Sequence, residues 1–130
     1  KVRVDHPNVR FTGYIPSESE DIDTVAGVDA VAIISNVESY GALNKILEPM
    51  ALKVPVITTS KGTIGIKGIV PNENIVLTEE KDFVGTVNSL MRDDNLRRQI
   101  GVNGRNLVER YHSSTVVRKD LFDCLDSIDR

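Results

Sequence analysis

Apolar and polar residues follow one another along this chain in blocks that predict strands and helices in turn. Residues 30–34 form an apolar run without polar alternation, which is typical of a strand buried on both faces of a parallel sheet. Further strands are predicted at 9–11, 56–58 and 74–77, and helices at 18–26 and 42–52. This order predicts an α/β, Rossmann-like parallel sheet with flanking helices, formed by residues 1–130 as a single domain.

Three more helices are predicted after residue 80, because each stretch carries an apolar stripe at helical spacing. Asp93 or Asp94 is expected to cap the second of them and Ser113 or Ser114 the third. All three stripes are expected to be buried: Phe83, Val84, Val87, Leu90 and Met91; then Leu96, Ile100, Leu107, Val108 and Tyr111; then Val117, Leu121, Cys124, Leu125 and Ile128.

The helix at 42–52 combines an apolar face with a face that carries charges. Leu43, Ile46, Leu47, Met50 and Ala51 share the first face and are expected in the core. On another face, Gly41, Lys45 and Glu48 follow one another at helical spacing. A helix N-terminus presents free N–H groups and a partial positive charge, which suit a phosphate, and Glu48 could accept hydrogen bonds from sugar hydroxyls.

The same two charges have a simpler interpretation. Lys45 and Glu48 could form an exposed ion pair worth only ~0.2–0.5 kcal/mol. A cation near the positive end of a helix is mildly unfavourable, however, and pairs chosen for stability more often place the acid first. Spacing alone therefore leaves both interpretations open.

Composition excludes several classes of protein. The net charge of −3 gives no electrostatic case for nucleic acid or an anionic membrane surface. The single cysteine, Cys124, excludes an internal disulfide, and its place on an apolar helix face predicts core packing. His6 and His112 are far apart, so no metal site is expected. No apolar run approaches the ~18 residues that a membrane span needs, so a cytoplasmic protein, or one peripheral to the inner membrane face, is expected.

Four stretches resemble, in the same order along the chain, the group 1 family of retaining glycosyltransferases with the GT-B fold. The run from Lys45 to Gly62 resembles the family's helix, Gly-x-Pro-Val turn and strand. The others are Asn8–Ile15, Gly27–Ile34 and Asp93–Val108, the last with a Gly-x-x-Gly-Arg pattern. The resemblance extends from about Asn8 to Tyr111 and implies the nucleotide-sugar-binding C-terminal half of such an enzyme.

The resemblance also implies roles for particular residues. Glu48 matches the acid that binds the ribose of the nucleotide, and Lys45 matches a basic residue at the diphosphate. Glu38 is a candidate for the family's first acid, near the donor sugar, so Glu38 and Lys45 are the expected catalytic residues. The remaining expected donor-binding residues are Gly13, Tyr14 and Ile15 at the base, Tyr40 over the ligand, and Gly41 and Ala42 at the diphosphate.

The chain departs from the family pattern at three positions. Nine residues separate Glu38 from Glu48, against seven in the usual motif, so either the loop is longer here or Glu38 is a solvated carboxylate without a role. Pro49 replaces the usual alanine. Lys53 replaces the glycine that ends the helix, where a left-handed conformation costs a non-glycine residue roughly 1 kcal/mol.

The expected strand order leaves a gap in the sheet. In a doubly wound sheet of order 3-2-1-4-5-6, the strands at 9–11 and 30–34 would be the third and fourth, with the first and second between them. Residues before 9 are too few to supply both. An incomplete C-terminal half of a GT-B fold is therefore expected, which alone would be partly unfolded, rearranged or completed by another chain.

The expected function is that of the donor-binding part of a glycosyltransferase. The donor would be a UDP- or GDP-sugar bound as substrate, with no cofactor or metal, and the acceptor a glycan, a glycolipid or a polysaccharide that meets an N-terminal domain. The unusual acid spacing and Pro49 keep open a non-catalytic nucleotide-sugar-binding or regulatory module. A flavodoxin-like regulatory domain is a third, less favoured alternative.

Overall fold

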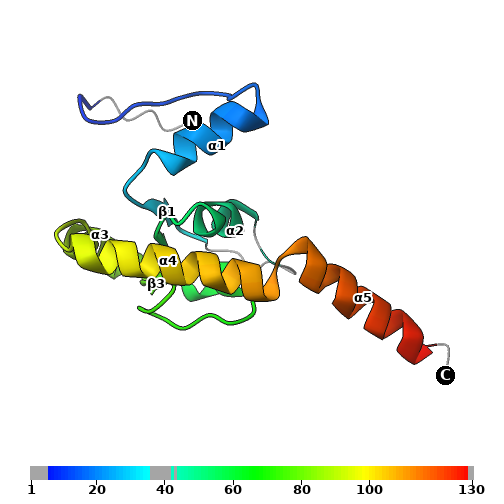
Figure 1. Cartoon of the computed structure of the whole chain (residues 1–130). Coiled ribbons are helices and arrows are strands. Elements are labelled where there is room, and N and C mark those ends of the chain that lie inside the picture. The colour runs from blue at the N-terminus through cyan, green and yellow to red at the C-terminus, as the bar shows by residue number, and fades with distance from the viewer. Residues whose placement is uncertain (1–5, 36–41, 43, 129–130) are drawn as a thin grey trace.

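A computed structural model describes residues 6–35, 42 and 44–128 of the chain. Its strands β1 (Val31–Ile33), β2 (Val56–Thr58) and β3 (Val76–Leu77) form a parallel sheet in the order β1-β2-β3 (Figure 1). The predicted α/β architecture is therefore confirmed. The other elements are α1 (Glu18–Ala26), α2 (Asn44–Ala51), η1 (Ser60–Thr63), η2 (Glu80–Asp82), α3 (Phe83–Met91), α4 (Asp94–Tyr111) and α5 (Ser114–Ile128).

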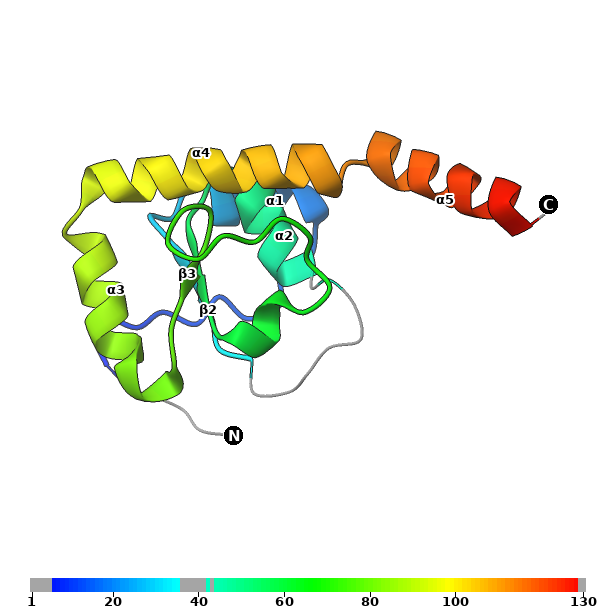
Figure 2. The ribbon, with the colours of Figure 1, turned by 90° about the horizontal axis from the view of Figure 1, so that it is seen from below.

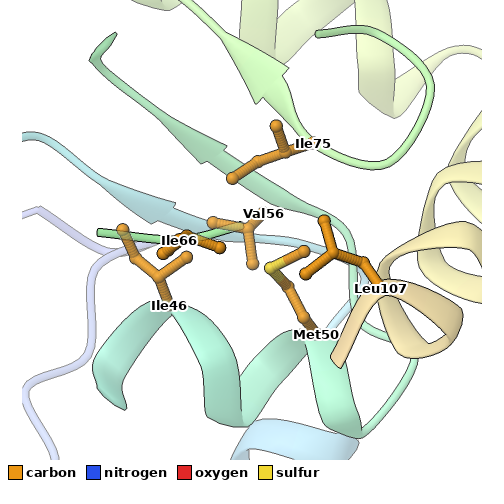
Figure 3. Packing of buried hydrophobic residues seen from close by; sticks show 6 residues of the cluster. All are labelled: Ile46, Met50, Val56, Ile66, Ile75 and Leu107. Atoms are coloured by element: carbon orange, nitrogen blue, oxygen red, sulfur yellow. The ribbon is translucent and has the colours of Figure 1, made fainter. Parts of the chain in front are cut away.

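The apolar core of the described residues lies on both faces of this sheet. On one face α2 and the second half of α4 cover β2, through a cluster of Ile46, Met50, Val56, Ile66, Ile75 and Leu107 (Figure 3). On the other face α3 and the first half of α4 bury Ile57, Val76, Leu90 and Ile100. The central strand β2 is consequently buried throughout, including Thr58 at its end, as expected of a strand covered on both faces.

Two glycines of the Gly-x-x-Gly-Arg pattern let α4 approach neighbouring backbone closely, Gly101 at the end of α2 and Gly104 at the turn before β3. A Cβ added at Gly101 would lie 2.2 Å from the carbonyl oxygen of Lys53, and one added at Gly104 would lie 3.2 Å from the carbonyl oxygen of Asn74. The guanidinium of Arg105 then donates to the carbonyl oxygen of Ala51 at 2.5 Å. This pattern therefore packs the helices and satisfies a carbonyl in the last turn of α2.

Helix α2 ends in a Schellman motif with a lysine in the left-handed position. Lys53 has φ 61°, its N–H donates to the carbonyl of Met50 at 3.1 Å, and the N–H of Val54 donates to the carbonyl of Pro49 at 2.9 Å. Val54 and Pro49 are both buried, which supplies the apolar contact of the motif. The left-handed conformation expected at Lys53 is thus confirmed.

Replacing this lysine by glycine is expected to stabilise the protein. Lys53→Gly removes the steric cost of the left-handed conformation and should raise the free energy of unfolding by about 1 kcal/mol. Urea denaturation measures the change. Asn72→Gly, also at positive φ, is the matched control and should gain less, because asparagine tolerates this conformation. Loss of stability in Lys53→Gly would contradict the prediction.

Several sequence predictions of burial are wrong. Residues 9–11 form no strand, and the predicted apolar stripe of α5 is exposed, including Leu121 (56%) and Cys124. Helix α5 extends away from the sheet, so no element of the described chain covers its apolar stripe (Figures 1 and 2). On α3, Val84 and Met91 face solvent, whereas Leu90 is buried.

The predicted helix caps are confirmed. The carboxylate of Asp93 accepts a hydrogen bond from the N–H of Leu96 at 2.9 Å, and the hydroxyl of Ser113 accepts one from the N–H of Val116 at 3.4 Å. None of the helices in the described part of the chain is both long enough and apolar enough to cross a membrane.

Candidate functional site

The carboxyl ends of β1 and β2 define the edge of the sheet at which α/β proteins bind ligands. Helix α2 follows β1 and η1 follows β2, so both elements begin at this edge (Figure 2). They also lie against each other, because a Cβ added at Gly62 would lie 3.2 Å from Cδ1 of Ile46 and 2.3 Å from the hydroxyl of Thr58, which is too close for any side chain. Glycine at this position therefore lets η1 pack directly beside the first turn of α2.

Lys45 and Glu48 lie on the solvent side of α2, at the second and fifth residues of the helix. Both are exposed, while Ile46 and Met50 on the opposite face are almost completely buried. The helix phase predicted from the sequence is thus confirmed. Among the described residues no ion pair joins Lys45 to Glu48, so the interpretation as a surface ion pair has no support. Both side chains are therefore exposed to solvent and not paired with each other.

Two threonines that the sequence analysis overlooked fix the backbone at the same edge. The Thr58 hydroxyl donates to the carbonyl of Ile33 at 2.7 Å, and the Thr59 hydroxyl donates to the carbonyl of Ser35 at 2.7 Å. Both bonds tie the end of β1 to the end of β2. A threonine pair after an apolar strand was the available signal, but threonine is also an ordinary strand residue, which hides it.

The residues expected at the nucleotide base lie in a different part of the structure. Gly13 has φ 70°, Tyr14 is 90% exposed and Ile15 is half-buried. Tyr14 and Ile15 line a hollow of about 450 Å³ together with residues of α1, and neither Lys45 nor Glu48 contributes to it. The structure therefore does not bring these two groups of residues together in one hollow.

The other expected site residues are less informative. Ala42 is half-buried and packs against the cluster around Ile46, whereas Glu38, Tyr40 and Gly41 lie outside the described residues. A larger hollow, of about 590 Å³, lies between β3, α3 and α4 and contains none of the expected site residues. The candidate site is thus defined by the start of α2, η1 and the two threonines, with Lys45 and Glu48 as its charged groups.

A parallel α/β sheet with an open carboxyl edge is typical of nucleotide-binding folds. Comparison with known families makes the assignment definite: residues 6–107 match the model of glycosyl transferases group 1, and the chain belongs to this family.

Individual relatives agree with the assignment. The chain is 32% identical over 119 residues to the capsular polysaccharide biosynthesis glycosyltransferase CapM of Staphylococcus aureus, covering 89% of this chain and 30% of CapM. It resembles the crystal structure of the C-terminal domain of a glycosyl transferase group 1 family protein (LpcC) from Francisella tularensis, with 28% identity and a TM-score of 0.67. That similarity covers 80% of this chain and 53% of the LpcC domain.

These comparisons confirm the family and the fold that the ordered motifs predicted. The sheet and its helices are those of the C-terminal domain of a group 1 glycosyltransferase. The chain spans about a third of the length of CapM and about half of the LpcC domain. The roles of the individual site residues stay predictions.

Proposed function

We propose that this chain is the donor-binding part of a glycosyltransferase. The enzyme would move a sugar from a nucleotide-diphosphate sugar to a glycan, glycolipid or polysaccharide acceptor. Membership of the group 1 family supports the reaction type, and the role of CapM in capsular polysaccharide biosynthesis supports the kind of acceptor.

The observation that carries the proposal is the pair of exposed charges at the start of α2. Lys45 lies in the first turn, beside N–H groups that have no partner within the helix, where an anion is favoured. Its ammonium and these N–H groups would stabilise the diphosphate as it departs, which is electrostatic catalysis without proton transfer. Glu48, one turn further on, would accept hydrogen bonds from the ribose hydroxyls. Glu38 would lie near the donor sugar.

Titration of the full-length protein with UDP-sugars and GDP-sugars tests the proposal. Glu48→Gln should weaken donor binding about tenfold, because a charged acceptor of hydrogen bonds contributes roughly 1.5 kcal/mol. Isothermal titration calorimetry measures the change, and Glu80→Gln, at an exposed acid on η2, is the matched control.

Fragments of the donor separate the two roles. Glu48→Gln should weaken the binding of the nucleoside and leave pyrophosphate binding unchanged, whereas Lys45→Ala should do the reverse. Absence of donor binding, or donor binding that Glu48→Gln leaves unchanged, would contradict the proposal.

The longer spacing between Glu38 and Glu48, with Pro49, favours a second candidate function. In that case the domain is a non-catalytic module that binds a nucleotide-sugar or has a regulatory role, and it transfers no sugar. Donor binding without transfer or hydrolysis by the full-length protein would support this alternative, and turnover that is lost in Glu48→Gln would exclude it.

A further inference from the structure

Two hydroxyl bonds hold the end of β1 against the end of β2, and the second of them reaches beyond the sheet. The pairing of these strands ends where Ile33 lies opposite Thr58. The Thr58 hydroxyl donates to the carbonyl of Ile33, and the Thr59 hydroxyl donates to the carbonyl of Ser35, two residues past that point. These bonds therefore guide the chain as it leaves β1 at the ligand-binding edge of the sheet.

Thr58 lies where β1, η1 and α2 meet. A Cβ added at Gly62 of η1 would lie 2.3 Å from the Thr58 hydroxyl and 3.2 Å from Cδ1 of Ile46 on α2. Because a packed interior has little free volume, it transmits small displacements from one element to the next. A shift of the Thr58 side chain would therefore move η1 and the first turn of α2, where Lys45 is exposed.

Burial alone does not favour threonine at position 58. Thr58 is 0% exposed, and valine has nearly the same shape without a polar group that must be satisfied. Two other buried polar side chains of the described residues, Asn74 and Thr78, form hydrogen bonds to residues at most eight positions away. The bonds of Thr58 and Thr59 span 25 and 24 positions. They therefore hold two separate strands together at the candidate site.

We propose that Thr58 and Thr59 are positioning residues of the donor site. Their role is indirect, because Thr58 is inaccessible to a ligand and the Thr59 hydroxyl is already bonded. The two hydroxyls fix the backbone at the end of β1 and the packing of η1 on the first turn of α2. Lys45 and the N–H groups of the helix then meet the departing diphosphate in one geometry, which stabilises the transition state more than the bound donor. This inference rests on the proposed function and extends it to two uncharged side chains.

Steady-state kinetics of the full-length protein test the proposal, with a UDP- or GDP-sugar that it turns over as the probe. Thr59→Val keeps the shape of the side chain and removes the bond to Ser35. Its kcat should fall about tenfold, with KM for the donor changed by less than about twofold, because a small misplacement of reacting groups costs rate. Thr59→Ser keeps the hydroxyl and should restore kcat. Since Thr59 is only half-buried, both variants should fold.

Thr78→Val is the matched control for a purely structural loss. Thr78 is also buried, at the end of β3, and its hydroxyl lies 3.0 Å from the carbonyl oxygen of Glu79 and 3.0 Å from the Thr86 hydroxyl. Thr78→Val should lower the thermal unfolding midpoint at least as much as Thr59→Val does. Its kcat should stay unchanged, because both bonds connect Thr78 to the segment after β3 rather than to β1.

Several results would overturn the proposal. A wild-type kcat in Thr59→Val would show that the bond to Ser35 does not position the site. Equal losses of kcat in Thr59→Val and Thr78→Val would show that general destabilisation lowers the rate. A loss of kcat that Thr59→Ser does not restore would exclude the hydroxyl as its cause. Absence of donor turnover by the wild-type protein would instead overturn the proposed function and this inference with it, so the two failures are distinguishable.

Discussion

Gly101→Ala is expected to destabilise the protein by about 3 kcal/mol, among the largest effects of any single added methyl group in the chain. The new Cβ would lie 2.2 Å from the carbonyl oxygen of Lys53 and 3.0 Å from its carbonyl carbon. These are backbone atoms in the turn that ends α2, so they cannot move aside as a flexible side chain would. To remove this steric clash, α4 must shift away from α2, and this shift disturbs the contact that positions α2 on the sheet. Equilibrium denaturation in urea measures the loss.

Two other helical glycines make the test specific. Gly85 on α3 has open space around its added Cβ, so Gly85→Ala should stabilise the protein by roughly 0.5–1 kcal/mol through helix propensity. Gly104→Ala, with the carbonyl oxygen of Asn74 at 3.2 Å, should fall between the two. Equal effects of Gly101→Ala and Gly85→Ala would refute the close packing of α4 on α2.

The elements with strong periodicity were predictable from the sequence alone. Strand β2 has the predicted bounds, 56–58, because an apolar run between turn residues has few alternatives. Helix α4 carries its stripe through Ile100 and Leu107 and has a recognisable cap at Asp93. On α2 the helical phase correctly separated buried Ile46 from exposed Lys45. Local sequence suffices where the pattern and the tertiary contacts agree.

The sequence predictions that proved wrong concern side chains whose burial depends on neighbouring helices or strands. The stripe of α5 is apolar at helical spacing, but whether Leu121 is covered depends on what lies beside the helix, which periodicity does not encode. Residues 9–11 have the composition of a strand, yet a strand requires a partner edge. Both errors therefore arise from the same cause, since the pattern reports a preference for burial and the fold decides whether a partner is present.

The candidate site was predictable only in part. The helical face of Lys45 and Glu48 follows from spacing, and the structure agrees with it. The hydroxyl bonds of Thr58 and Thr59 to the end of β1 join residues about 25 positions apart, so the threonine pair alone does not reveal their partners. Spacing likewise could not show that Tyr14 and Lys45 line no common hollow, because that depends on the path of the chain between them.

The second large effect is expected for Ile46→Ala, at the centre of the cluster that holds α2 on the sheet. Ile46 is completely buried and packs with Met50 and Val56, and its Cδ1 lies close to Gly62 of η1 (Figure 3). Truncation removes apolar contacts and leaves a cavity between α2, β2 and η1, at a cost of about 3 kcal/mol. Thermal or urea unfolding measures the loss.

Leu121→Ala is the matched control, because the sequence predicts burial for Leu121 as well, whereas the structure leaves it 56% exposed on α5. Its effect on the free energy of unfolding should stay within about 0.5 kcal/mol. A cost similar to that of Ile46→Ala would mean that α5 packs against the domain after all. A small cost for Ile46→Ala would mean that α2 is held otherwise, and the placement of Lys45 and Glu48 at the edge of the sheet would lose its structural basis.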